Sequence, residues 1–411
     1  MNIITIKEQC SACGACINIC PVHCISFVQN EYGMIQPLVD ENRCIDCNLC
    51  LRVCPHFERI NKRKPLQCLA AYRKDMSEAM NCASGGIAYS LYEKFISEDY
   101  YVVGVQLDQN NKAVFNITNR KEEIFAFQGS KYVQADIRGL YENIENILKI
   151  GRKILIIALP CQIAAINRFI IYKKLPLDNV IFVDCLCHGV SPQKYFDEEI
   201  EYFISKFKWN KIKQITFRSN YKYRDYNLTI FAETSKREKV YCAATDMDYY
   251  YSGFYEGVSL CECCYKCDYS QVNRVSDISI GDYINVGSNA KYPQYCGKRN
   301  NVSIVLCNTQ KGLEIISSLN NVLNLFERPL EEAVEQCPAL REPCVRPENR
   351  KIFMHKYRIG GFIYAAYSTL DVNKGKIRKR LRQIFKQQYL LNALFRRIVD
   401  TVQNRGRHGI K

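Results

Sequence analysis

Eight cysteines near the start of the chain constrain its fold more than any other feature. They form two runs of identical spacing, C-x2-C-x2-C-x3-C-P, made by Cys10, Cys13, Cys16, Cys20, Cys44, Cys47, Cys50 and Cys54. This spacing holds 4Fe–4S cubanes, because three closely spaced thiolates wrap one side of a cubane and the fourth ligand comes from elsewhere. Pro21 and Pro55 follow the two fourth cysteines and keep the chain from continuing as a helix.

The two runs are predicted to exchange their fourth ligands. In two-cluster ferredoxins the last cysteine of each run ligates the other cluster, so Cys54 joins the first three cysteines and Cys20 joins the second set. Zinc sites and a disulfide cage are the alternatives, but zinc ribbons usually show two C-x2-C pairs. Residues 1–60 are therefore expected to form a ferredoxin-like domain that carries electrons on two 4Fe–4S clusters, with residues 3–6 and 25–28 as short strands.

The composition fits a metal-binding protein of a reducing compartment. The chain has 411 residues, room for about two to three domains, and its 23 cysteines far exceed ordinary usage. No apolar signal segment precedes Cys10, and no apolar stretch reaches the length of about 18 residues that spans a membrane. We therefore expect a cytoplasmic and anaerobic setting, with contact to a membrane surface left open.

Residues 68–190 alternate strand-like and helix-like segments. The expected strands are residues 68–72, 101–107, 153–159 and 180–185, and the expected helices are residues 85–97, 140–150 and 162–169. Apolar strands that alternate with helices predict a mixed α/β domain with a sheet buried on both faces, and α+β overall with the ferredoxin-like part. Ligands gather at the carboxyl ends of such strands, where Cys161 and Cys187 lie.

The remaining chain is predicted to form a second, less regular domain and a tail. In residues 191–350 we expect a helix at 193–207 and strands at 212–218, 227–233 and 303–307. Residues 351–411 are expected to be a basic helical tail, because residues 374–411 hold 12 Lys or Arg and one acidic residue. This tail either packs on the body, lies on an anionic membrane surface or docks an acidic partner; no nucleic-acid-binding module is visible.

A third metal site is suggested away from the ferredoxin-like domain. Cys264 and Cys267 form a C-x2-C pair, and with Cys161 and Cys187 they would supply four thiolates for a third 4Fe–4S cluster. Cys261 and Cys263 are further candidates. The alternatives are half of a zinc site or cysteines that simply pack as small buried residues, and spacing alone leaves them open.

Six short motifs in order resemble one protein family. They are ASGG at 83–86, QGSKYVQ at 128–134, LPCQ at 159–162, CHGV at 187–190, CYKC at 264–267 and SDISIGD at 276–282. From residue 68 to about residue 346 the chain resembles the family of coenzyme F420 hydrogenase/dehydrogenase beta subunits, in the variant with an N-terminal two-cluster ferredoxin domain. Residues 68–190 would then be the N-terminal-type domain of that family and residues 191–350 the C-terminal-type domain.

The resemblance implies a flavoprotein that binds FAD and one further 4Fe–4S cluster, and it supports Cys161, Cys187, Cys264 and Cys267 as ligands. One departure follows Asp282, where family members often have an aromatic residue and then a glycine. Here the glycine is delayed to Gly287, which is expected to change the edge of the flavin pocket.

The flavin contacts are predicted from residues that offer phosphate and ring partners. Glycines at a helix start let a phosphate approach backbone N–H groups, and a lysine or arginine adds charge. The candidates are Ser84, Gly85, Gly86, Gly129, Ser130, Lys131, Tyr132, Arg274, Ser276, Asp277, Gly281 and Asp282. Each residue alone also suits an ordinary loop or cap, and no G-x-G-x-x-G fingerprint is present. Lys131 and His188 are the candidate catalytic residues.

These features predict an iron–sulfur flavoprotein oxidoreductase. Electrons would pass between the ferredoxin-type clusters and, through FAD, a two-electron hydride acceptor or donor. One alternative is an electron-relay subunit of a larger hydrogenase or dehydrogenase without turnover of its own. Another is a reductase of an organic metabolite, for example a sugar-linked one. The expected partner is a redox protein or a small electron carrier.

Overall fold

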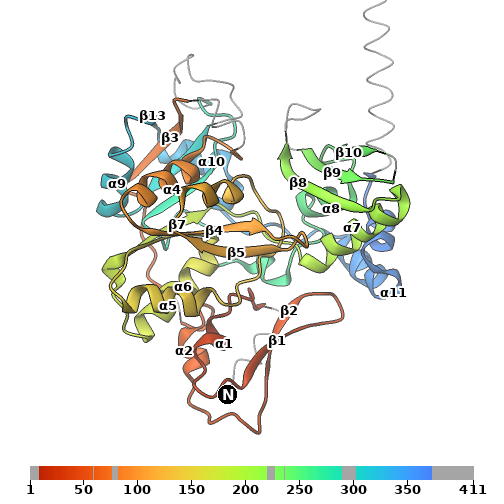
Figure 1. The fold of residues 1–411 in the computed structure, drawn as a ribbon, viewed down its shortest axis with the longest axis horizontal. Coiled ribbons are helices and arrows are strands. Elements are labelled where there is room, and N and C mark those ends of the chain that lie inside the picture. Colours follow the sequence, from red (N-terminus) through yellow and green to blue (C-terminus); the bar gives the residue numbers. More distant parts are fainter. Residues whose placement is uncertain are drawn as a thin grey trace, which may run out of the picture.

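Three parts are visible in the computed structural model of the chain, which describes residues 9–58, 60–75, 82–219, 227–235, 237–288 and 302–372. Figure 1 shows a large sheet with its helices, a smaller sheet beside it and a small N-terminal region below. The strand expected at residues 3–6 and the basic helix expected in residues 374–411 lie outside the described residues.

The N-terminal region is built around the two cysteine runs. It contains two short helices and one antiparallel hairpin: α1 (Ala15–Ile19), α2 (Leu49–Val53), β1 (Ile25–Gln29) and β2 (Ile35–Val39). Each helix begins inside a cysteine run and stops at its fourth cysteine, because Cys20 and Cys54 adopt extended backbone before a proline. The ferredoxin-like fold predicted for this region is confirmed.

An eight-stranded mixed sheet forms the centre of the molecule. Its strands are β3 (Gln67–Arg73), β4 (Tyr101–Leu107), β5 (Ala113–Thr118), β6 (Ile154–Ala158), β7 (Val180–Cys185), β11 (Ile278–Asp282), β12 (Ser303–Cys307) and β13 (Leu323–Glu327). The order is β13-β3-β12-β11-β7-β6-β4-β5, and the four strands β11, β7, β6 and β4 run parallel. Strands from both sides of residue 190 therefore share one sheet.

Helices cover both faces of this sheet, as a continuous apolar strand requires. The covering helices are α4 (Ile87–Ser97), α5 (Leu140–Lys149), α6 (Pro160–Tyr172), α9 (Gln310–Ser317) and α10 (Leu330–Gln336). In β6, Ile154 and Ile156 pack toward α5 and α6, whereas Leu155 and Ile157 pack toward α4. The mixed α/β architecture predicted from the alternating segments is confirmed.

The smaller sheet is antiparallel and lies on three helices. Its elements are β8 (Lys211–Ser219), β9 (Asn227–Glu233), β10 (Glu238–Ala243), α7 (Gln193–Phe207), α8 (Tyr249–Tyr255) and α11 (Arg350–Thr369). Helix α11 falls within the expected tail, yet Phe353 and Phe362 are fully buried in the same core as α7 and α8. The body thus extends well past residue 351. Within the described ranges, no helix combines the length and the apolar character that crossing a bilayer requires.

The N-terminal region shares its core with the large sheet. Cys13, Ile19 and Val53 pack in one apolar cluster with α5, α6 and β6. Gly14 has φ +78° and sits so near the body that a Cβ there would lie 2.8 Å from Ile137 Cγ2. The two parts are therefore packed as one unit.

Candidate functional site

The first group of cysteines is Cys10, Cys13, Cys16 and Cys54, the set predicted to hold one cluster. Cys16 lies within electrostatic range of the other three thiols. Burial raises the pKa of Cys10, Cys13 and Cys54 to about 11. Every cysteine that the structure describes is a free thiol. A converging set of four soft sulfur donors fits a 4Fe–4S cluster.

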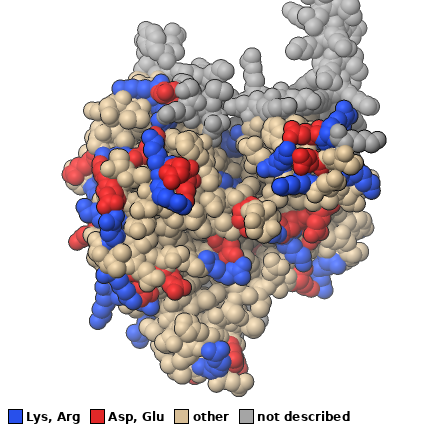
Figure 2. All heavy atoms as spheres, in the orientation of Figure 1, with Lys and Arg blue, Asp and Glu red and all other residues tan. Residues whose placement is uncertain are grey.

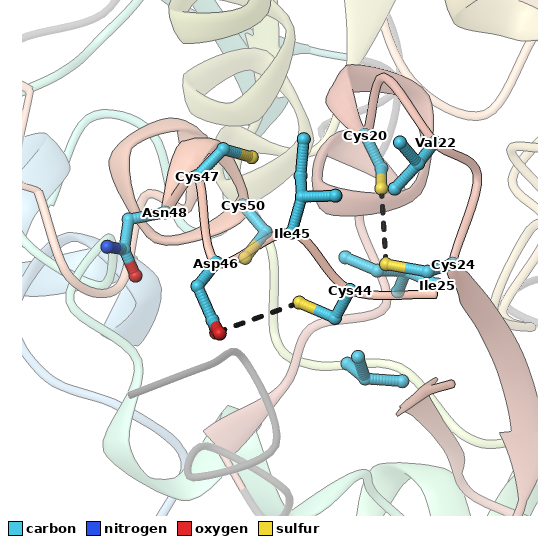
Figure 3. A pocket seen from close by; sticks show the side chains of 11 residues that line it. Cys20, Val22, Cys24, Ile25, Cys44, Ile45, Asp46, Cys47, Asn48 and Cys50 are labelled. Atoms are coloured by element: carbon cyan, nitrogen blue, oxygen red, sulfur yellow. Dashed lines mark hydrogen bonds between the residues drawn. The ribbon is translucent and has the colours of Figure 1, made fainter. Parts of the chain in front are cut away.

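The second group surrounds a small hollow of about 20 Å³ that opens to solvent (Figure 3). It is lined by all four predicted ligands of the other cluster: Cys20, Cys44, Cys47 and Cys50. Cys47 is exposed. A fifth cysteine that no spacing rule assigned, Cys24, also lines the hollow, with its Sγ 3.4 Å from Cys20 Sγ. This donor set fits a 4Fe–4S cluster at the surface.

The third group forms where two parallel strands end. Cys161 begins α6 directly after β6, and Cys187 follows β7. Cys264 and Cys267 come from the loop around the short 3-10 helix η4 (Glu262–Lys266). The pKa of the Cys161 thiol is raised well above its usual value, by burial and then by Cys267, Cys187 and Cys264. The four residues predicted to hold a third cluster are therefore brought together, and their chemistry fits one.

The three groups follow one another in space. Cys16 lies within electrostatic range of Cys50, a thiol of the second group. The first group also approaches the third, because Cys13 is close enough to Cys161 to raise the pKa of its thiol. Tyr141 lies between these two groups, and its hydroxyl donates a hydrogen bond of 2.7 Å to the carbonyl oxygen of Cys13. The first group thus lies next to both the second and the third.

The loop of the third group is fixed by a buried arginine. Arg274 is 2% exposed and forms an ion pair with buried Asp184 on β7. Its guanidinium also donates to the carbonyl oxygens of Tyr269 and Gln271, at 2.8 and 3.0 Å. Arg274 therefore ties the loop after Cys267 to the strand that leads to Cys187. The phosphate contact expected of it remains a prediction, and the structure gives the guanidinium an internal role.

Two further predicted flavin contacts, Ser276 and Asp277, form hydrogen bonds within the protein. Ser276 Oγ donates to Asp184 at 2.5 Å. The Asp277 carboxylate accepts from the Phe182 backbone N–H at 3.0 Å and from Thr309 Oγ1 at 2.9 Å. These bonds hold β7, β11 and the start of α9 together.

The predicted phosphate loop before α4 is packed against the sheet. Ser84 Oγ donates to the Val302 carbonyl at 3.0 Å, and the Gly85 N–H donates to Ser303 Oγ at 2.9 Å. A Cβ on Gly85 would overlap the Ala71 carbonyl oxygen, and Gly86 starts the helix at φ +79°. The two glycines thus allow α4 to approach β3 closely.

The second predicted flavin-binding segment, from Gly129 to Tyr132, is less closely packed at Gly129 than the loop before α4 is at Gly85. Gly129 has φ +76°, and the space where its Cβ would lie contains no atom of the described structure within 4 Å. Lys131 Nζ donates to the carbonyl oxygens of Ala126 and Gln128, at 3.0 and 2.8 Å. Burial lowers the pKa of Lys131 to about 7. Among the described residues this ammonium has no carboxylate partner, so it suits an anionic ligand.

Lys131 lies next in the chain to Tyr132, which is close to the contacts that join the two sheets. The neighbouring Tyr132 lies within electrostatic range of Arg218 and Asp282 and stacks on Phe254, with ring centres 4.7 Å apart. Arg218 Nη1 contacts both Asp282 oxygens, at 2.8 and 2.7 Å, and joins the end of β8 to the end of β11. Sequence reasoning missed Arg218, which carries no motif.

The remaining predicted residues lie at the edges of this region. Gly281 packs against Leu186, whose Cβ would lie 2.8 Å from an added Cβ. Ser130 contacts Tyr132. His188 Nε2 is 3.3 Å from the Phe254 carbonyl oxygen, and burial lowers its pKa. Its predicted catalytic role stays a prediction, because these neighbours also suit a structural histidine.

Two protein-family models match the chain. Residues 9–57 match the 4Fe-4S dicluster domain, and residues 151–332 match the C terminus of the coenzyme F420 hydrogenase/dehydrogenase beta subunit. Residues 151–332 thus match the C-terminal domain of these beta subunits, and residues 9–57 add a dicluster domain. The resemblance predicted from the motifs is confirmed, and the chain is an iron–sulfur protein of the 4Fe–4S type.

Individual relatives are distant. The F subunit of the F420H2 dehydrogenase of Methanosarcina mazei is 20% identical over 193 residues, which are 44% of this chain and 53% of that protein. The chain thus spans about half the length of this relative. The I subunit of the NADH-quinone oxidoreductase of Pelobacter propionicus is 33% identical over 69 residues, 14% of this chain and 37% of that protein. A chain of the F420-reducing [NiFe] hydrogenase complex from Methanosarcina barkeri is similar at 18% identity and TM-score 0.43, covering 78% and 93% of the two chains.

Proposed function

We propose that the chain conducts electrons between a carrier at its surface and a flavin in its interior, through three 4Fe–4S clusters. The order of the three cysteine groups carries this proposal. The second group is at the surface, where Cys47 is exposed, and the first and third groups follow in turn through Cys16 and Cys161. A carrier would meet the second group, and each later centre is near the one before it.

We place the flavin beside Lys131, near the point where Arg218 and Asp282 join the two sheets. Lys131 supports this, since its buried ammonium lacks a carboxylate partner among the described residues and would favour a phosphate or a reduced ring. Open space at Gly129 allows a ligand to approach the backbone. The bound clusters carry single electrons and FAD exchanges two, which would permit exchange of a hydride with an organic carrier or substrate.

A second candidate is a relay subunit that hands its electrons to a partner enzyme. It is favoured by the names of two relatives, which are subunits of a dehydrogenase and of an oxidoreductase. In that case the clusters are present, but the isolated chain does not turn over. Under either function we propose a cytoplasmic protein that meets a redox partner.

Iron, labile sulfide and flavin per chain test the proposal on anaerobically purified protein. We expect about twelve iron and one FAD, and a loss of about four iron in Cys264→Ser. Cys242→Ser is the matched control, because Cys242 lies on β10 and accepts a hydrogen bond from Thr229. About eight iron without flavin would leave only a ferredoxin relay, and unchanged iron in Cys264→Ser would rule out the third site.

A further inference from the structure

A cavity of about 410 Å³ lies at the seam between the N-terminal hairpin and helix α11. We call it the seam pocket. The β1–β2 hairpin contributes Tyr32 and Met34, and α11 contributes Lys351, Met354 and His355. Figure 1 shows the hairpin projecting on the side of the molecule where α11 lies. None of the predicted flavin contacts lines this pocket.

The walls of the seam pocket carry an excess of positive charge. Four cationic side chains line it, those of Arg346, Arg350, Lys351 and Arg358, against the single carboxylate of Glu262. On the face drawn in Figure 2, by contrast, acidic and basic side chains alternate. The concentration of one sign in a concave site raises the local concentration of anions.

The ion pairs around the pocket leave one cation uncompensated. Glu262 is engaged by Arg346 and by Arg350, with 2.7 Å to the latter. Arg358 pairs with Glu31 on the hairpin turn at 3.2 Å. Lys351 is exposed and makes neither an ion pair nor a hydrogen bond with any residue that the structure describes. Its ammonium is therefore available to a ligand.

Part of the pocket lining is apolar. Met34 on the hairpin and Met354 on α11 both line the pocket, together with Ile35. Thioether side chains adapt to ligands of irregular shape and contact aromatic rings favourably. A pocket lined by both cationic and apolar side chains fits a molecule that has an apolar body and one charged end.

We propose that the seam pocket binds a small organic anion, with its phosphate or carboxylate group on Lys351 and its apolar body against the two methionines. The pocket also touches Cys10 of the first group and Cys261 beside the third. A bound anion would thus place negative charge next to the iron–sulfur path. The inference does not depend on the flavin or on the direction of electron flow.

Calorimetric titration of the cluster-loaded protein with phenyl phosphate tests this proposal. We expect one saturable site per chain and binding at least about tenfold weaker in Lys351→Glu, the scale of one lost charged contact. Lys356→Glu is the matched control, because it makes the same charge change on the same helix but does not line the pocket. We expect it to bind within about twofold of the unaltered protein.

Three companion titrations complete the test. Benzoate and phenyl phosphate compare the two anionic groups, and saturable binding of either one supports the site. Inorganic phosphate should bind more weakly than phenyl phosphate, because it lacks a body for the apolar part of the lining. Absence of saturable binding of both organic anions, or equal weakening by both variants, would overturn the proposal. Docking of an acidic carrier protein without binding of either anion would assign the surface to a protein partner instead and would likewise overturn it.

Discussion

Cys24 is an additional thiol at the second group and has no place in the ligand spacing. Its Sγ is 3.4 Å from Cys20 Sγ, so with Cys20 as a metal-bound thiolate the Cys24 S–H would donate a hydrogen bond to it. Hydrogen bonds to ligand sulfur stabilise the more negative, reduced cluster. In Cys24→Ala we therefore expect unchanged iron and a lower reduction potential for the second centre, measured by EPR-monitored redox titration.

Cys242→Ala, far along the chain on β10, should leave this potential unchanged. If Cys24→Ala instead lost about four iron per chain, Cys24 would be a ligand and the predicted assignment of Cys20 would be wrong.

The proposed role of Lys131 predicts that flavin binding depends on pH. Because burial lowers its pKa to about 7, the side chain is charged below that pH and increasingly neutral above it. Affinity for FAD should therefore fall as the pH rises from 6 to 8. The quenching of flavin fluorescence on binding measures this affinity. Lys131→Met should bind about tenfold more weakly at pH 6 and show a flatter profile.

Lys121→Met, a change at an exposed lysine nearby that pairs with Glu93, should keep the pH dependence of the unaltered protein. The role of Lys131 is contradicted if its methionine variant shows the same profile.

At the level of single residues, spacing and resemblance predicted which cysteines meet, because ligand spacing is local in the chain. The roles of Arg274 and Arg218 were not predictable in this way. Arg274 meets Asp184 from a distant segment, and Arg218 meets Asp282, so both roles depend on how the strands assemble. A charged residue in a loop does not reveal from sequence whether its partner is a ligand or a buried carboxylate.

Among the elements, the start of α8 rests on two buried carboxyl groups. Glu199 on α7 accepts from the Tyr250 N–H at 3.0 Å, and Asp248 accepts from the Tyr251 N–H at 2.8 Å. Burial raises the pKa of both, that of Glu199 well above its usual value and further through Asp248. The pair therefore retains a proton that the unfolded chain releases.

Folded-state pKa values above the unfolded ones make this pair lose stability as the pH rises. The loss begins above about pH 4 to 5, where carboxyls of the unfolded chain ionise. Between pH 5 and 8, thermal unfolding should show a smaller loss of stability in Glu199→Gln than in the unaltered protein. At pH 8 the variant should be about 1 kcal/mol more stable than the unaltered protein. Glu201→Gln, on the exposed side of the same helix, should keep the original decline. An unaltered decline in Glu199→Gln would exclude the shared proton.

Gly85 tests whether the start of α4 is a packing site. A Cβ there overlaps the Ala71 carbonyl oxygen, so Gly85→Ala should lower the free energy of unfolding by about 3 kcal/mol. Gly129→Ala meets open space and should cost only about 1 kcal/mol for its left-handed backbone. Denaturant titrations measure both. A stable Gly85→Ala variant that has lost its flavin would instead support the predicted phosphate contact.

Several elements were predictable because their signals are local. The apolar runs that became β6 and β7 and the periodic helix α7 appear where expected. Strand β13 was not foreseen, and α11 was expected only as part of a basic helical tail, without its place in the core. β13 is a partly exposed edge strand of five residues, and α11 has mixed polarity around Gly360 and Gly361, where its backbone is kinked. Their positions follow from the sheet and helices on which they pack, which sequence periodicity does not contain.

For the whole molecule, the order of the three cysteine groups predicts the order in which their clusters lose iron in air. The second group opens to solvent, whereas Cys13 and Cys16 are at most 8% exposed. Brief exposure to air should therefore lower the iron content from about twelve to about eight per chain before further loss. Iron assays on timed samples measure this plateau. A simultaneous decline of all iron would contradict the proposed order.

The shared core beneath the N-terminal region determines how electrons can travel. Many multicentre proteins deliver electrons by swinging a tethered carrier domain, and such a delivery slows in a viscous solvent. Here Cys13 and Val53 are buried in one core with α5 and α6, and Gly14 fits closely against Ile137. Transfer from the N-terminal centres to the body therefore requires no diffusion of one part against the other. Added glycerol should slow only the encounter with the external carrier.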